Sequence, residues 1–331
     1  MPLLFSYLLF LISSCQSPSP EVGKGNQVVP SPALRIEESS FTRYPLLVSS
    51  DYGSSWQNGS RNLPDDISVS FLEQKGEEIV IATNNKGLWI SRDQFNRWQQ
   101  IGTELPSLKV NALHIDGDNV YVGVFRKGIY HSPDEGASWQ SLNYDLPTLS
   151  IQAIYEYEGY LFVGTDIGIY RSKKGSSHWE AVHTGPQVLS MYGYNGKLVA
   201  GSSQGTLLSE NGGKSWRWIR QEGAVHYTHN IGRRVYELVL NGDLIYSDDW
   251  GKTWQETFYQ PREGSYVYEI VQVGDSLLLS NNYGVHRSAD NGLSWNLIYP
   301  TEKMVFFDFL VINGTLYGGT RTWDEYRKRK R

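Results

Sequence analysis

Hydrophobic and polar residues alternate in short runs along most of this chain. Apolar and polar side chains alternate from Val110 to Ile115, again from Val120 to Val124 after one turn, and from Ile129 to Ser132 after another. Alternation over four to eight residues is typical of a half-buried β-strand, and such short turns join antiparallel neighbours. With a fourth strand beginning at Trp139, the pattern predicts a four-stranded antiparallel sheet in about 40 residues.

This unit recurs along the chain. Each copy contains an eight-residue segment that starts with Ser and ends with Trp, such as SPDEGASW at Ser132–Trp139. The seven closing tryptophans follow one another at intervals of 37 to 42 residues. A fixed period of this length is the signature of one supersecondary unit stacked many times, and four strands per unit form the blade of a β-propeller. The sequence therefore predicts an all-β fold with seven blades.

The ends of the repeat indicate how the ring closes. After Trp295 the chain offers two more strands, Val305–Ile312 and Thr315–Gly319, but no eighth Ser-to-Trp segment. The first segment is preceded by a single strand, Pro45–Ser49. We expect the two C-terminal strands to join the N-terminal hairpin in a seventh blade, because sharing a blade hides the sheet edges that an open array exposes.

The Ser-to-Trp segment has the chemistry of a tight hairpin. Asp134 can accept hydrogen bonds from backbone amides that follow it, and Gly136 can adopt the positive φ that the turn requires. Ser138 can fasten the same loop with its hydroxyl group. We expect Trp139 to pack between neighbouring blades, where burial of its large ring stabilises the core.

These segments resemble the Asp-box, or bacterial-neuraminidase repeat, Ser-x-Asp-x-Gly-x-Thr/Ser-Trp, over residues 41–326. Five copies keep the Asp, whereas Lys174 replaces it in the fourth. Copies two and four lack the glycine and have Phe95 and Ser176 instead, so we expect less regular hairpins there. The resemblance implies a structural role on the outer rim for Asp51, Trp56, Asp93, Trp98, Asp134, Trp139, Trp179, Asn211, Trp216, Asp249, Trp254, Asp290 and Trp295.

The N-terminal residues predict export and lipidation. An apolar stretch from Leu3 to Ile12 suits the h-region of a signal peptide, and Ile12-Ser-Ser-Cys15 resembles the bacterial lipobox. Cys15 is the only cysteine, although no Lys or Arg precedes the apolar stretch, and a plain signal peptide is the alternative. We expect a lipoprotein signal peptide at 1–14, a lipidated Cys15 with a flexible linker through 15–40, the propeller at 41–326 and a basic tail at 327–331.

Charge and histidine spacing limit the kinds of partner and cofactor that we expect. A net charge of −5 argues against nucleic-acid binding. His226 and His229 are three apart in one strand, which places them on opposite faces, so we expect no metal pair there. We expect no metal or other cofactor elsewhere in the chain. We predict a monomer, anchored by its N-terminal lipid to a membrane of a bacterial cell envelope, in the periplasm or on the surface.

The functional surface of a propeller is normally the face around its central channel. The turns before each third strand lie there and differ from blade to blade. A carbohydrate-active alternative needs two carboxylates about 5 to 10 Å apart, and Asp65, Asp66, Asp166 and Asp308 are the candidates. The predicted ligand contacts for a protein or glycan are Arg126, Lys127, Asp166, Gln204, Asn282, Tyr283, Arg321 and Trp323.

The sequence lacks features that are typical of the enzymes and receptors with related repeats. Sialidases need a Phe/Tyr-Arg-Ile-Pro segment before the first repeat, and nothing before Ser49 fits it. Xyloglucan-active endoglucanases use two tandem propellers, and sortilin-type receptors use ten blades with cysteine-rich modules. The chain is most similar to single seven-bladed propellers related to the photosystem II assembly factor. That resemblance implies a non-enzymatic, extracytoplasmic binding or assembly module, with a glycoside hydrolase as the alternative.

Overall fold

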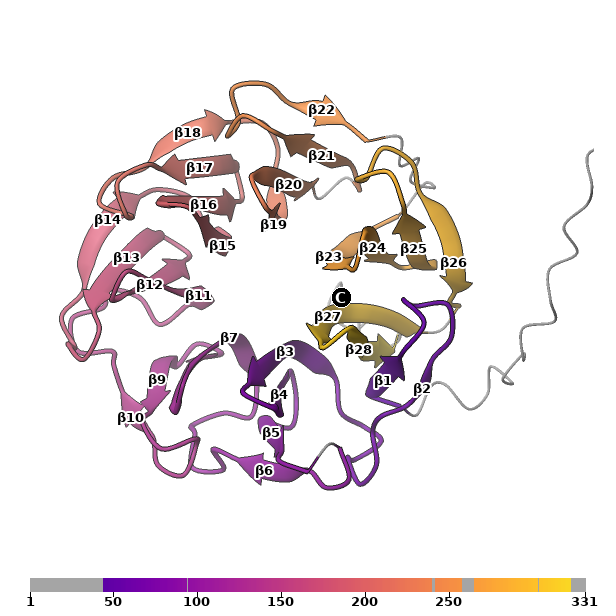
Figure 1. Ribbon diagram of the computed structural model, residues 1–331. Coiled ribbons are helices and arrows are strands. Elements are labelled where there is room, and N and C mark those ends of the chain that lie inside the picture. Colours follow the sequence, from indigo (N-terminus) through magenta and orange to yellow (C-terminus); the bar gives the residue numbers. More distant parts are fainter. Residues whose placement is uncertain (1–43, 94, 240–241, 258–264, 303, 323–331) are drawn as a thin grey trace, which may run out of the picture. The chain divides into compact units, whose positions relative to one another are not determined.

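The computed structural model describes residues 44–322 except for 94, 240–241, 258–264 and 303 (Figure 1). The predicted signal peptide, Cys15, the linker, Trp323 and the basic tail lie outside the described residues. A compact unit, Glu38–Arg331, contains all the described strands. These strands form seven four-stranded antiparallel sheets, which we call blades 1 to 7. The predicted all-β, seven-bladed propeller is therefore confirmed.

Six blades each consist of four consecutive strands. Blade 1 contains β3 (Val69–Lys75), β4 (Glu78–Thr83), β5 (Leu88–Ser91) and β6 (Gln99–Ile101). Blade 2 contains β7 (Val110–Asp116), β8 (Asn119–Val124), β9 (Gly128–Ser132) and β10 (Gln140–Ser141). Blade 3 contains β11 (Ile151–Tyr157), β12 (Tyr160–Thr165), β13 (Gly168–Lys173) and β14 (Glu180–Thr184). Blade 4 contains β15 (Val188–Tyr194), β16 (Lys197–Ser202), β17 (Gly205–Ser209) and β18 (Arg217–Arg220). Blade 5 contains β19 (Val225–Ile231), β20 (Arg234–Val239), β21 (Leu244–Ser247) and β22 (Gln255–Glu256). Blade 6 contains β23 (Val267–Val273), β24 (Ser276–Asn281), β25 (Gly284–Ser288) and β26 (Asn296–Pro300).

Blade 7 is built from both ends of the described chain. Its order is β2 (Gln57–Asn58), β1 (Leu46–Ser49), β28 (Thr315–Thr322) and β27 (Met304–Ile312). β1 and β28 pair antiparallel, and the Thr320 hydroxyl donates to the Tyr44 carbonyl at 2.7 Å. The predicted closure is confirmed: residues far apart in sequence supply one sheet, which hides the edges of the array.

The first strand of each blade lies nearest the centre of the ring and the fourth lies outermost (Figure 1). Because the strands alternate in direction, one face of the ring carries the turns between second and third strands and the links between blades. We call this the linker face. The opposite face carries the Ser-to-Trp hairpins and the turns between first and second strands.

The Ser-to-Trp hairpins are held by a repeated set of hydrogen bonds. In blade 2 the Gly136 amide donates to Ser132 Oγ at 2.7 Å, and the Ser138 amide donates to Asp134 Oδ1 at 2.8 Å. Hydrogen bonds from Ser138, followed by one from Ser132, lower the pKa of Asp134 to about 2. The equivalent bonds recur at Asp51, Asp249, Asp290 and Asn211, so an amide side chain serves as well as a carboxylate.

Two copies depart from this scheme, as their sequences predict, but to different degrees. In copy two Phe95 adopts φ 70° in place of glycine, and its amide still donates to Ser91 Oγ at 3.0 Å. In copy four, which has Lys174 at the Asp position, Ser172 Oγ donates instead to the Ser176 carbonyl at 3.1 Å. Only copy four therefore loses the arrangement.

The tryptophans pack between blades as expected. Trp56 is 2% exposed and lies with Leu47 of blade 7 and Leu278 of blade 6 in one apolar cluster, 4.4 Å from the ring of Phe306 between ring centroids. Trp98 and Trp179 are also buried, whereas Trp139, Trp216, Trp254 and Trp295 are half-buried. Each joins a cluster that spans two neighbouring blades, so the core is a continuous ring.

Candidate functional site

Most of the predicted ligand contacts lie on turns of the linker face. Arg126, Lys127, Asp166 and Gln204 are exposed on the turns between the second and third strands of blades 2, 3 and 4. The corresponding turn of blade 6 is less open, since Tyr283 is half-buried and Asn282 is 5% exposed. Asn282 Oδ1 accepts a hydrogen bond from the Tyr266 amide at 2.8 Å. The side chain of Asn282 therefore holds a link in place.

Arg321 also has structural contacts. It lies near the end of β28, where its Nε donates to the Val69 carbonyl and its Nη2 donates to Ser70 Oγ at 2.7 Å. Its guanidinium carbon lies 3.3 Å from the ring centroid of Phe307. Arg321 therefore joins blade 7 to blade 1 beside the channel. Its predicted partner Trp323 lies outside the described residues.

Aliphatic side chains are exposed on the same face as these polar turns. Leu108 and Leu149 lie on the links that follow blades 1 and 2, and Ile167 lies on the β12–β13 turn of blade 3. Their exposed fractions are 38%, 44% and 39%, high for residues of this type. Sequence reasoning missed these three, although short polar links that contain an isolated Leu or Ile are visible in the sequence.

The channel wall contains a network of carboxyl groups that the sequence analysis largely missed. The carboxyl groups of Glu269 of β23 and Asp308 of β27 interact with each other, and Tyr227 of β19 interacts with Glu269. Asp308 Oδ2 also accepts the Leu72 amide of β3 at 2.6 Å. These interacting side chains therefore connect blades 5, 6, 7 and 1 at the point where the ring closes.

A further carboxyl continues this wall into blade 2. Glu73 Oε2 of β3 accepts the Ile115 amide of β7 at 3.1 Å. Burial, and then the charge of Asp308, raise the pKa of Glu73 to about 8. Burial likewise raises the pKa of Asp308 to about 7, and burial together with Asp308 raises that of Glu269 well above its usual value. Glu269, whose pKa is raised further, therefore keeps its proton beside Asp308.

Aromatic side chains occupy the remaining wall. His114 of β7, Tyr155 of β11, Tyr192 of β15 and His229 of β19 follow one another with ring centroids 6.1, 5.9 and 5.1 Å apart. Burial lowers the pKa of both histidines to about 4, so they are neutral near pH 7. Among the described residues, no group of three or more His, Cys, Asp and Glu side chains has the arrangement of a metal site.

Three of the four carboxylates of the enzymatic alternative have separate partners, and none of the four faces another of them. Asp66 pairs with Lys86 at 2.9 Å between oxygen and nitrogen, and Asp166 accepts the Thr148 hydroxyl at 2.7 Å; both are exposed, as is Asp65. Only Asp308 lies in the channel wall, and its carboxyl neighbour is Glu269. An acidic residue near the middle of the largely apolar strand Val267–Val273 is the signal that could have identified Glu269.

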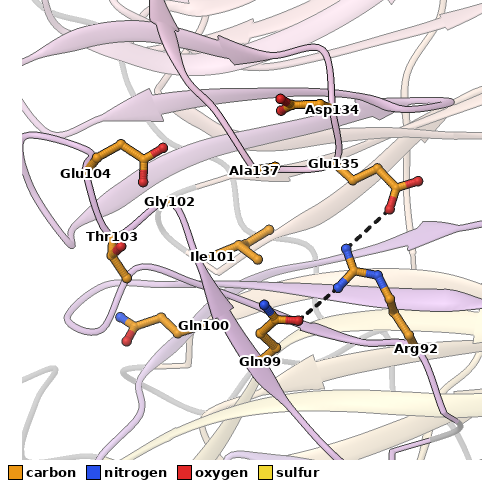
Figure 2. A pocket seen from close by; sticks show the side chains of 11 residues that line it. Arg92, Gln99, Gln100, Ile101, Gly102, Thr103, Glu104, Asp134, Glu135 and Ala137 are labelled. Carbon is orange, nitrogen blue, oxygen red and sulfur yellow. Dashed lines mark hydrogen bonds and ion pairs between the residues drawn. The ribbon is translucent and has the colours of Figure 1, made fainter.

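An open pocket lies on the outer rim between blades 1 and 2, lined by β6 and the Ser-to-Trp hairpin of blade 2 (Figure 2). Arg92 bridges it, donating to Gln99 Oε1 and to Glu135 Oε2 at 3.2 Å each. Lys75 Nζ donates to the other oxygen of Glu135 at 2.7 Å. These ion pairs satisfy the charged groups and connect the two blades, so the pocket is part of the blade contact.

No helix in the described part of the chain has both the length and the apolar character needed to cross a membrane. No protein-family model and no curated protein matches the sequence. Solved structures do resemble the fold. The extracellular domain of BT4673 from B. thetaiotaomicron matches with a TM-score of 0.65 and 16% identity, covering 79% of this chain and 38% of that one. The chain thus spans well under half of that protein's length.

Two further likenesses are to YCF48 and to an enzyme. YCF48 from Cyanidioschyzon merolae matches with a TM-score of 0.58 and 15% identity, over 77% of this chain and 95% of that one. YCF48 in a structure described as bound to D1 peptide reaches 22% identity. The GH74 xyloglucanase from Xanthomonas campestris matches with a TM-score of 0.57 and 17% identity, over 70% and 45%. At these identities the likenesses show the fold, a seven-bladed β-propeller.

Proposed function

We propose that this chain is an extracytoplasmic binding module that recognises a partner protein through the linker face of its propeller and has no chemistry of its own. The observation that carries the proposal is the composition of that face: Arg126, Lys127, Asp166 and Gln204 are exposed on variable turns, with Leu108, Leu149 and Ile167 exposed near them. Variable turns on a rigid ring are the usual means by which propellers bind ligands.

Two neighbours of similar fold support the same role. YCF48 is described as bound to D1 peptide, and the BT4673 segment is described as an extracellular domain. A signal peptide and lipidation at Cys15, predicted from the sequence, would hold the propeller near a membrane surface through the linker. A module tethered in this way meets its partner in two dimensions, which raises its effective concentration.

A glycoside hydrolase is supported less well. Hydrolysis needs two carboxyl groups separated by about 5 to 10 Å so that the sugar fits between them. Glu269 and Asp308 instead contact each other directly, and the Leu72 amide fills a further acceptor site of Asp308. The remaining candidates, Asp65, Asp66 and Asp166, are exposed and have other partners or none among the described side chains.

Site-specific photo-cross-linking in cells that produce the full chain tests the proposal. A photoreactive amino acid at Gln204, on the linker face of blade 4, is compared with one at Lys214, exposed on the opposite face of the same blade. We expect a discrete protein adduct from Gln204 and none from Lys214. Adducts at Lys214 alone would place binding on the other face, and release of reducing ends from sialosides or glucans by the purified chain would replace the proposal with catalysis.

A further inference from the structure

The turn between β8 and β9 of blade 2 has an unusual backbone. The chain reverses through Phe125, Arg126 and Lys127, and the Lys127 amide donates to the Val124 carbonyl at 2.9 Å. Arg126 has φ 53°, in the left-handed region that side chains other than glycine and asparagine seldom adopt. The same turn of blade 2 is followed by a glycine at positive φ, Gly128, so this blade has two residues at positive φ and Arg126 is the second of them. In the other second-to-third-strand turns among the described residues, positive φ falls on glycines alone: Gly87, Gly168, Gly205, Gly242 and Gly284.

The side chains around this turn gather positive charge on one aromatic ring. The guanidinium carbon of Arg126 lies 5.1 Å from the ring centroid of Phe125, and Lys109 Nζ lies 3.8 Å from the same centroid. The Phe125 amide donates to the Lys109 carbonyl at 2.9 Å, which fixes the link from blade 1 against this turn. Within the described part of the chain neither Arg126 nor Lys127 forms an ion pair, so their charge faces solvent.

Exposed apolar side chains flank these cations on both sides. The Gly87 amide donates to the Leu108 carbonyl, and the Gly128 amide donates to the Leu149 carbonyl at 3.1 Å, so both leucines lie on links bonded to neighbouring turns. Asp166, which accepts the hydroxyl of Thr148, brings the turn that carries Ile167 beside the second link. We call these seven residues the blade-2 patch: Leu108, Lys109, Phe125, Arg126, Lys127, Leu149 and Ile167.

We propose, on the basis of the proposed function, that the blade-2 patch is the docking site for a segment of a partner protein in which acidic residues lie next to aliphatic ones. Charge complementarity carries the choice of partner. A carboxylate can pair with the planar guanidinium of Arg126 in a bidentate manner, while leucine or valine neighbours cover Leu149 and Ile167. Burying exposed aliphatic side chains against an apolar partner contributes to the binding free energy. A sugar or a phosphate backbone would bury them less completely.

Because Arg126 has a strained backbone, replacing it with glycine distinguishes a binding role of its side chain from a structural one. Arg126 adopts a costly φ and forms no ion pair with the described part of the fold, so a gain on binding a partner would offset the cost. The substitution Arg126→Gly relieves the strain and keeps the turn, so the fold should persist with an equal or higher Tm. The same substitution removes the guanidinium, so docking of an acidic segment should weaken.

Fluorescence anisotropy with a defined probe tests this assignment. The probe is a labelled twelve-residue peptide that alternates Glu or Asp with Leu or Val, and a second peptide replaces each acid with its amide. We expect the acidic peptide to bind the full chain, the amide peptide to bind at least tenfold more weakly, and R126G to lose about tenfold in affinity, equivalent to about 1.4 kcal/mol. Arg233→Gly, the same charge change on an exposed turn of the opposite face, should bind like the wild type.

Three results would overturn the assignment: equal binding of the two peptides, unchanged affinity of R126G, or no binding of the acidic peptide at millimolar concentration. A Leu149→Ser variant that binds as the wild type does would remove the apolar half of the site. The cross-link at Gln204 distinguishes the two levels of the proposal. If Gln204 still captures a protein when R126G binds normally, the linker face functions but the blade-2 patch does not carry it.

Discussion

The carboxyl groups of the channel wall make the stability of the ring depend on pH in a direction opposite to that of most proteins. Glu73 has a folded pKa of about 8 against an ordinary value of 4.5. The folded chain therefore binds more protons than the unfolded chain between about pH 4.5 and 8. The free energy of unfolding should fall as the pH rises through that window, because ionised Glu73 faces Asp308 in a poorly hydrated wall.

The size of the effect follows from these two pKa values. A single group with a folded pKa near 8 loses about 1 kcal/mol of stabilisation between pH 7.0 and 8.5. Asp308, with a pKa of about 7, adds a smaller amount. The half-buried histidines His114 and His229 act in the opposite direction, since their lowered pKa values cost stability only as the pH falls from 6.5 towards 4. A change of 1 kcal/mol shifts Tm by about 2 to 4 °C in a chain of this size class.

The assay is thermal unfolding of the wild type and of Glu73→Gln at pH 7.0 and 8.5. The glutamine amide retains an oxygen that can accept the Ile115 amide but cannot ionise. We expect the wild type to lose about 3 °C between the two pH values and E73Q to lose clearly less. Glu77→Gln, an exposed neighbour with the same change of charge, should keep the wild-type dependence. The reasoning fails if E73Q and the wild type lose the same number of degrees.

Substitutions at four further residues test individual contacts. Trp56→Ala should lower the free energy of unfolding by about 3 to 5 kcal/mol, and Trp139→Ala by less because its ring is half-buried, as measured by denaturant titration. Asp134→Asn should melt close to the wild type while Asp134→Ala melts earlier, since Asn211 already forms the same bonds in blade 4; equal melting of both variants would contradict this. Arg321→Met should lower Tm by freeing the Val69 and Ser70 contacts between blades 7 and 1, and should leave peptide binding at the blade-2 patch unchanged, which anisotropy can check.

The fold could be predicted from the sequence because each blade is a local unit. Alternation, turn residues and a closing tryptophan lie within about 40 residues, so the repeat fixes the blades without knowledge of distant contacts. Copy two shows where local rules are overridden. Phe95 keeps the hairpin without glycine because its ring packs 4.8 Å from that of Tyr317 and 6.1 Å from that of Trp98, between ring centroids. That compensation comes from blade 7, which the local sequence does not reveal.

The candidate site could be predicted only in part. The turns of Arg126, Asp166 and Gln204 follow directly from the blade pattern, which also gives their face. The contact between Glu269 and Asp308 does not, because the two belong to different blades and meet only through the angle at which blades pack. The contacts of Arg321 with blade 1 could not be predicted either, because a contact across the closing seam depends on the three-dimensional ring.

The neutral carboxyls of the channel wall also change how the charge of the chain should be interpreted. The formal net charge of −5 treats every carboxyl as ionised, and keeping Glu73 and Glu269 protonated changes it from −5 to −3. The two lost charges lie in the wall of the ring, so they no longer repel an acidic partner that approaches the linker face. The field at blade 2 is then set mainly by Arg126 and Lys127, which are exposed side by side on one short turn. A chain that is acidic overall can thus attract an acidic segment at one place.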